Sequence, residues 1–95
     1  MKTGIELIAE ERERQVSQEG WTPEHDQEHR LGELAKAAAC YAVHHTDADV
    51  IESDEDAWPW AEKWDKRGND PVRNLVKAGA LVAAEIDRIQ KREAL

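Results

Sequence analysis

The sequence predicts an all-α fold, a small bundle of three main helices in one domain of 95 residues. Apolar residues recur at spacings of three and four along three stretches, which is the period of a helix with one buried face. Each stretch also begins with a residue type that caps helix starts. A domain of this size buries only about two-thirds of the surface that its unfolded chain exposes. We therefore expect a small core and association into a homo-oligomer.

The first helix is expected at about residues 4–19. Thr3 and Glu6 fit a capping box, in which each side chain bonds to the other residue's backbone N–H. Gly20 is expected to end the helix. The apolar stripe of this helix is thin and consists of Ile5, Ile8 and Val16, with the aliphatic stem of Arg12 between them. Such a helix is expected to cover a core without forming one.

The second helix is expected at about residues 23–45. Thr22 is placed as its N-cap and Pro23 as its first residue, where the missing N–H has no cost. The residues at helical spacing are Leu31, Leu34, Ala35, Ala38, Tyr41, Ala42 and His45. Residues 46–57 carry six acids and no regular apolar period, so an exposed acidic loop is expected there.

The third helix is expected at about residues 71–92, after a Trp-rich segment. Asp70 and Pro71 repeat the cap-then-proline signal. Gly79 costs about 1 kcal/mol relative to alanine inside a helix, so close packing, for example against Ala38, is the expected reason for it. The apolar face consists of Val72, Leu75, Val76, Gly79, Val82, Ala83, Ile86 and Ile89.

Charge and cysteine content restrict the class of protein. The formal net charge is −8, and the basic residues are not clustered, which argues against direct binding to nucleic acid. Cys40, the single cysteine, lies in an alanine-rich run and is expected to be a small buried hydrophobe. No apolar run approaches the roughly 20 residues of a membrane span, and no signal peptide is recognisable. We expect a cytoplasmic protein that does not bind membranes.

Two histidines one helical turn apart suggest a metal site. His25 and His29 have Asp26 between them, and Glu33 lies one further turn along the expected helix. This spacing resembles H-E-x-x-H metal sites, with aspartate in place of glutamate. His25, His29 and Glu33 are therefore candidate ligands of a divalent metal. The alternative is that acids in the first turn stabilise the helix dipole and the histidines are simply exposed.

Aromatic residues suggest a second kind of site. Trp21, Trp58, Trp60 and Trp64 have basic neighbours and could stack a planar base, as aromatic platforms do. Because the chain has no phenylalanine, most of the indoles are equally candidates for the core. No glycine-rich phosphate loop, nucleophile motif or dinucleotide fingerprint is present, so no catalytic residue is assigned. The sequence favours a binding protein and leaves enzymatic activity open.

Several segments together suggest a family. They are Glu11-Arg12-Glu13-Arg14-Gln15, Glu19-Gly20-Trp21-Thr22-Pro23-Glu24-His25-Asp26, Gly32-Glu33-Leu34, Ala37-Ala38-Ala39-Cys40-Tyr41-Ala42, Trp58-Pro59-Trp60 and Leu75-Val76-Lys77-Ala78-Gly79-Ala80-Leu81. In this combination they resemble a family of short proteins encoded by bacteriophages and prophages. The resemblance covers nearly the whole chain and implies an accessory role during infection.

Two partial resemblances point to nucleotides. Residues 14–26, with Gly20-Trp21-Thr22, are similar to the start of the ryanodine-receptor repeat, a helical module associated with adenine nucleotides; its later part is not matched. Residues 32–35 resemble the helix of MazG-like nucleotide pyrophosphohydrolases. His29 and Arg30 stand where that family has paired glutamates, which counts against hydrolysis.

Three hypotheses follow. The leading one is a phage-encoded protein that holds a nucleotide or a nucleotide-derived signal and so counters host defence. Its expected ligand-binding residues are Arg14, Trp21, His25, Asp26, Trp58, Trp60 and Lys77. The second is a metal-dependent nucleotide hydrolase of the MazG-like kind. The third is an acidic inhibitor that occupies the basic surface of a host defence protein, as anti-CRISPR proteins do.

Overall fold

The helix starts follow the capping residues of the sequence. The computed structural model describes residues 1–44 and 58–94. Thr3 and Glu6 form the predicted capping box at the start of α1, Gly4–Gln18. The Thr22 hydroxyl accepts a hydrogen bond from the His25 N–H at the start of α2, Pro23–Asp26. Asp70 caps α5, Pro71–Ala94, by accepting from the N–H groups of residues 72 and 73.

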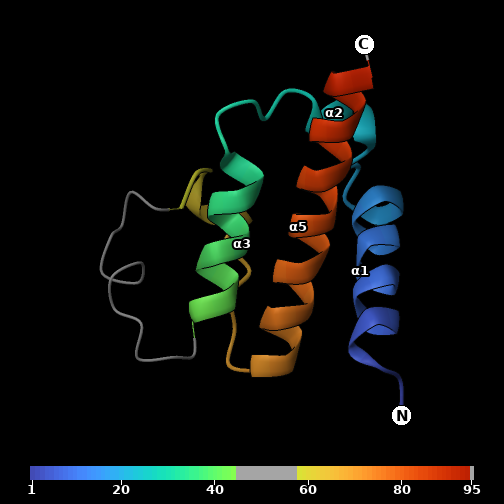
Figure 1. Ribbon diagram of the computed structural model, residues 1–95. Helices are drawn as coiled ribbons and strands as arrows, with labels where there is room; N and C mark the ends of the chain where they lie inside the picture. The colour runs from blue at the N-terminus through green and yellow to red at the C-terminus, as the bar shows by residue number, and fades with distance from the viewer. Residues whose placement is uncertain (45–57, 95) are drawn as a thin grey trace.

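α5 is the central element of the fold. Figure 1 shows it between α1 and α3, Glu33–Val43, while α2 lies near the C-terminal end of α5. A short 3₁₀ helix, η2, Glu62–Trp64, precedes α5. All regular elements in the described residues are helical, which confirms the predicted all-α class with three main helices. No helix among these residues is long and apolar enough to cross a membrane.

The single helix predicted at residues 23–45 is wrong. The structure divides this stretch into α2 and α3, and residues 27–32 connect them as turns. Gly32 has φ +82°, a left-handed conformation that cannot continue a right-handed helix. Leu31 was expected on the buried face but is 82% exposed because it lies in this connection. His45 and the acidic loop predicted at 46–57 lie outside the described residues.

The core is formed mainly between α3 and α5. Small side chains let these two helices approach closely. The buried cluster consists of Leu34, Ala37, Ala38, Tyr41, Ala78, Leu81 and Ala84. Trp21, Trp58 and Trp60 pack against it and supply the volume that phenylalanine supplies in other proteins. Cys40 is buried, as the sequence predicted.

The expected apolar stripe of α1 is only partly buried: Ile8 packs against Gly79 of α5 and Val16 is half-buried, but the most buried residues of the helix are polar. Ile5 is 82% exposed, whereas Glu11 and Gln15 are buried against α5. Glu11 can be buried because Arg14 binds both of its carboxylate oxygens, at 2.8 and 2.9 Å, and Arg73 of α5 also pairs with it. Polar pairing therefore joins α1 to α5 in addition to the apolar contact of Ile8 with Gly79.

The face of α5 predicted to be buried is also largely exposed. Val72, Leu75, Val82 and Ile86 are each about half exposed, and only Val76 of the large predicted residues is buried. The helix instead buries the arc that contains Asn74, Leu81 and Arg88. The close neighbour of Gly79 is Ile8 and not Ala38: a Cβ atom at position 79 would lie 2.5 Å from Ile8 Cδ1.

Candidate functional site

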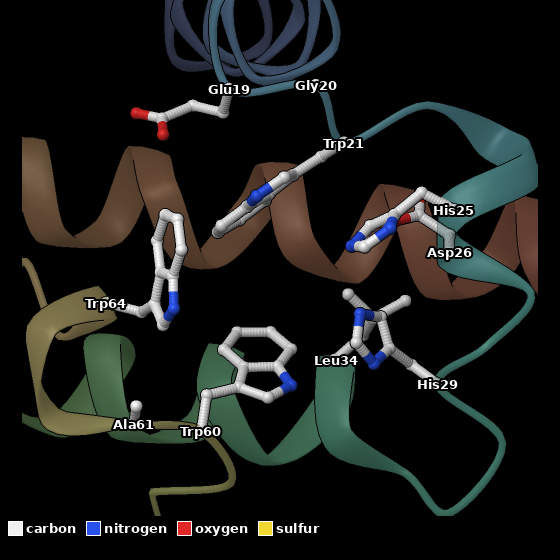
Figure 2. Close-up of a pocket in the computed structure, with 10 residues that line it drawn as sticks. All are labelled: Glu19, Gly20, Trp21, His25, Asp26, His29, Leu34, Trp60, Ala61 and Trp64. Atoms are coloured by element: carbon white, nitrogen blue, oxygen red, sulfur yellow. The ribbon is translucent and has the colours of Figure 1, made fainter.

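Three indoles surround one cavity of about 360 Å³. Trp21 comes from the turn between α1 and α2, Trp60 from the segment before η2, and Trp64 from the end of η2. Figure 2 shows the three rings around a shared space, with the histidines and Asp26 at one end. The complete lining is Glu19, Gly20, Trp21, His25, Asp26, His29, Leu34, Trp60, Ala61 and Trp64. We call this the aromatic pocket.

The turn after α1 holds Trp21 in place. Gly20 has φ +75°, and this left-handed residue reverses the chain so that the Trp21 N–H donates to the Gln15 carbonyl at 3.0 Å. Arg12 Nη1 donates to the Trp21 carbonyl at 3.1 Å. The backbone of Trp21 is therefore bonded on both sides, so its indole enters the pocket from a fixed position.

The rings meet at an angle and are not stacked in parallel. Trp21 and Trp60 have centroids 5.7 Å apart and an interplanar angle of 57°. His29 packs on the other side of Trp60, with ring centroids 5.2 Å apart. Trp60 Nε1 is buried and has no hydrogen-bond partner among the described residues. A buried donor without a partner is destabilising, and no acceptor among the described residues offsets this cost.

Asp26 supplies a buried carboxylate to the pocket. Its Oδ2 accepts from Arg12 Nη2 at 2.7 Å, and only 3% of the side chain is exposed. Burial raises the pKa of Asp26, and although the Arg12 charge and hydrogen bond oppose this shift, the pKa remains raised. One guanidinium thus compensates incompletely for burying this charge, and further hydrogen-bond donors from a ligand would stabilise it.

A second, much smaller void adjoins the aromatic pocket. It measures about 20 Å³, enough for one water molecule, and shares Glu19, Trp21 and Trp64 with the pocket. Its other lining residues are Glu11, Arg14, Gln15, Tyr41, Lys66, Lys77 and Leu81. Gln15 Oε1 is buried here without a hydrogen-bond partner in the described part of the chain. Polar and positively charged side chains therefore lie beside the indoles of the aromatic pocket.

Arg14 and Lys77, two of the cationic residues that line this void, differ in their ion-pair partners. Arg14 forms ion pairs with Glu11 and with Glu19, the latter at 3.0 Å. Lys77 Nζ lies 5.8 Å from the centre of the Tyr41 ring. Burial lowers the pKa of Lys77, and the nearby Arg73 charge lowers it further, because both disfavour the ammonium form. An anion near Lys77 would offset these two effects.

The structure brings together four of the seven ligand-binding residues expected from the sequence. Trp21, His25, Asp26 and Trp60 line the aromatic pocket. Arg14 and Lys77 line the adjoining void instead. Trp58 lines neither; its Nε1 donates to the Ala61 carbonyl at 3.2 Å, and its ring packs against Tyr41 and Trp60.

Sequence reasoning missed Glu19 and Leu34 as lining residues, and it named Trp64 among the indoles that could stack a base but not among the expected ligand-binding residues. Trp64 follows the Trp-Pro-Trp motif at a distance of four residues and carried no separate signal. Glu19 is adjacent to Gly20 and Trp21, so its place at the turn after α1 was the available signal. Leu34 was assigned only to the core, to which it also belongs.

The expected metal ligands are not assembled into a metal site. No group of three or more His, Cys, Asp or Glu side chains in residues 1–44 and 58–94 could hold a metal ion. His25 and His29 meet edge to face at 5.2 Å, and His29 Nδ1 lies 3.7 Å from a Glu33 carboxylate oxygen. The predicted spacing assumed one continuous helix, and the end of α2 at Asp26 removes that register.

No family model, curated protein or solved structure matches this chain. The function is therefore inferred from the residues that line the aromatic pocket.

Proposed function

We propose that this chain binds a small nucleotide or nucleotide-derived molecule, with the base in the aromatic pocket. The observation that carries the proposal is the set of three indoles, Trp21, Trp60 and Trp64, around one cavity of about 360 Å³. This volume falls within the range of roughly 300–1,000 Å³ that is typical of small-molecule sites. Stacking of a base on an aromatic side chain contributes about 1–3 kcal/mol, whichever base is bound.

Two polar groups of the pocket suit the edge of a base. Trp60 Nε1 is a buried donor that needs an acceptor, such as a ring nitrogen or a carbonyl oxygen. Asp26 is a buried acceptor that a ligand amino group would stabilise. A base that carries both an acceptor and an amino group on its edge fits this pair of requirements.

The phosphate groups would lie outside the aromatic pocket. Glu19 and Asp26 line the pocket, and their negative charge would repel a phosphate inside it. Lys66 and Lys77 line the adjoining void across the shared indoles. That void has room for only about one water molecule and is also lined by Glu11 and Glu19, so the phosphates of a nucleotide whose base contacts the indoles would point toward solvent.

Binding without conversion is the activity that these groups support best. The pocket offers stacking surfaces and hydrogen-bond partners, and the hydrolase hypothesis needs a metal group that the described residues do not provide. A protein that holds a nucleotide signal would lower its free concentration in a host cell. That effect would fit the accessory role implied by the resemblance to phage proteins.

Isothermal titration calorimetry against mono-, di- and cyclic nucleotides tests the proposal. Trp60→Leu removes stacking and should weaken binding on the order of 10- to 100-fold. Trp60→Phe keeps a ring but removes the N–H, so about a 3- to 10-fold loss is expected. Trp58→Phe, outside the pocket lining, is the matched control and should bind as the wild type does. Absence of heat with every nucleotide at millimolar concentration would refute the proposal.

The acidic lining favours a second candidate, a methylated ammonium ligand. Aromatic cages bind quaternary ammonium groups through the faces of their rings, and none of the residues that line the aromatic pocket is lysine or arginine. Choline and trimethyllysine should then bind in place of nucleotides. Glu19→Gln discriminates the two candidates, because it should weaken binding of a cation and strengthen binding of an anionic nucleotide.

A further inference from the structure

We propose that two copies of this chain associate through the exposed apolar side of α5 and the neighbouring wall of α3. Val72, Leu75, Val82 and Ile86 of α5 are 58, 47, 47 and 49% exposed. They occupy positions spaced by three and four residues, together with Gly79, onto which Ile8 of α1 packs, and the half-buried Ile89, so all six lie in one stripe along the helix. No charged residue occupies this stripe from position 72 to position 89. We call it the α5 stripe.

A groove lies directly beside the α5 stripe. It has a volume of about 360 Å³ and shares no lining residue with the aromatic pocket. Its α3 wall is made only of alanines, and Gly79, Val82 and Ile86 form part of its α5 wall. The full lining is Ala35, Ala38, Ala39, Ala42, Ala78, Gly79, Val82, Glu85 and Ile86. The surface therefore combines a hollow of small residues with protruding aliphatic side chains.

This combination suits a second copy of the same chain. A two-fold interface uses the same patch on both subunits, so each copy must carry both the protruding groups and the hollow that receives them. Val82 and Ile86 of one copy can enter the alanine groove of the other, while the same contact forms in reverse. A patch with only one of the two features would need a different partner.

The available area and charge also fit self-association. The four half-exposed side chains offer roughly 300–400 Å² of apolar surface, about half of the ~800 Å² per partner of a standard interface, which fits a weak dimer that forms as concentration rises. Glu85 is the single charged residue in the groove lining, and it pairs with Arg88 at 2.5 Å. The net charge of −8 is thus carried elsewhere, so it opposes association only at long range.

Sedimentation velocity of the full chain between 1 and 100 µM tests the proposal. We expect a concentration-dependent dimer. Raising NaCl from 50 to 500 mM should strengthen it, because salt screens the repulsion between two acidic subunits. A chain that stays monomeric at 100 µM in 500 mM NaCl would overturn the proposal. So would a dimer that dissociates as salt rises, because that behaviour indicates attraction between charges.

Variants locate the interface. Val82→Glu and Ile86→Glu should each raise the dissociation constant on the order of 100-fold, because each places a carboxylate inside the interface of both copies. Both residues are half exposed, so the monomer should retain its helical circular dichroism. Gln18→Glu adds the same charge on an exposed position of α1 and should leave the dimer unchanged. Dimers that persist in both interface variants would contradict the proposal.

Ala39→Leu distinguishes a specific, shape-complementary interface from non-specific apolar association. It adds apolar area without charge, so non-specific association would increase. A fitted interface loses its hollow, and the dissociation constant should rise at least about 10-fold through overpacking. Stronger association of this variant would overturn the two-fold arrangement described above.

Discussion

Glu11 and Asp26 are both about 2% exposed and both pair with arginine, yet their pKa values move in opposite directions. Burial raises the pKa of Glu11, but hydrogen bonds and charges from Arg14 and Arg73 outweigh burial, so the pKa is lowered. Burial also raises the pKa of Asp26, and there the single Arg12 does not outweigh it. Two guanidiniums oppose the effect of burial at Glu11, whereas one guanidinium and the smaller effects of His29 and His25 oppose it at Asp26, which accounts for the opposite directions.

This difference separates a carboxylate whose charge is paired within the chain from the one that we propose contacts the ligand. Glu11 is satisfied within the chain, since its partners come from α1 and α5 and join those helices. Asp26 lines the aromatic pocket and still lacks part of the stabilisation that its charge needs. An acid in a pocket whose pKa is raised by burial is a common property of functional sites. Substitutions at the two positions should therefore affect different properties.

The largest effect is expected at Glu11. Glu11→Gln removes the charge that pairs with two guanidiniums and should lower the free energy of unfolding by about 3 kcal/mol. This loss of unfolding free energy lies at the lower limit of the range for breaking buried ion pairs, because both arginines are partly exposed. Urea denaturation at pH 7 measures it. Glu10→Gln, at the exposed pair with Lys2, is the control and should change stability by less than about 0.5 kcal/mol. Equal losses in both variants would contradict the comparison.

Arg73→Met should make Glu11 resemble Asp26. With only Arg14 left, burial should prevail and the pKa of Glu11 should rise. Stability at pH 7 should fall by about 1.5 kcal/mol, as expected for a hydrogen bond to a charged group. NMR titration of the Glu11 carboxyl carbon measures the pKa directly. Arg92→Met, on an exposed position of α5, should leave it unchanged, and an unmoved pKa in Arg73→Met would show that Arg14 alone is sufficient.

Asp26→Asn should have a smaller effect on stability than on binding. The variant loses the ion pair with Arg12 but also loses the cost of burying a charge, so a change within about 1 kcal/mol is expected at pH 7. Binding of a ligand amino group should weaken roughly 10-fold in calorimetry. Asp87→Asn, exposed on α5, is the matched control. A stability loss as large as that of Glu11→Gln would mean that Asp26 is mainly structural.

The smallest effect is the dependence of stability on pH. Because the pKa of Glu11 is lowered, its contribution is present above the ordinary value of 4.5 and is lost as pH falls through the lowered pKa. Because the pKa of Asp26 is raised, its contribution is present below the ordinary value of 3.8 and is lost as pH rises through the raised pKa. Glu11→Gln should therefore lose less stability relative to wild type at low pH than at pH 7. Asp26→Asn should lose more stability relative to wild type at low pH than at pH 7. If the stability differences of both variants changed in the same direction with pH, the opposite pKa shifts of Glu11 and Asp26 would be disproved.

The sequence predicted the starts of α1, α2 and α5 correctly, because each start depends on contacts between residues that are close in the sequence. The caps at Thr3, Thr22 and Asp70 lie within three residues of the N–H groups that they bind, so the sequence reveals them. The break between α2 and α3 was missed because the left-handed conformation of Gly32 follows from how the two segments meet. Burial of Glu11 was missed because its partner Arg73 lies 62 residues away in the sequence.

Periodicity predicted that α5 is a helix but not which of its sides is buried. The large aliphatic residues form the exposed α5 stripe, whereas alanines, Asn74 and Arg88 face inward. Asn74 is buried because its side chain bonds to both the N–H and the carbonyl of Gly68. Trp21, His25 and Asp26 were found because they are close in sequence. Trp64 was named only as one of four indoles that could stack a base, since the tertiary fold alone brings η2 to the turn after α1.

The placement of the indoles has a practical consequence. Three of the four tryptophans line the aromatic pocket, and the fourth, Trp58, lies 5.6 Å from Trp60 between ring centroids. The one tyrosine, Tyr41, lies 5.8 Å from Trp58 and so can pass its excitation on to it, and the chain has no phenylalanine. Ultraviolet emission from this protein therefore originates almost entirely at the pocket. Binding of a ligand in the aromatic pocket should therefore change the intensity or wavelength of the intrinsic tryptophan fluorescence, without any added label.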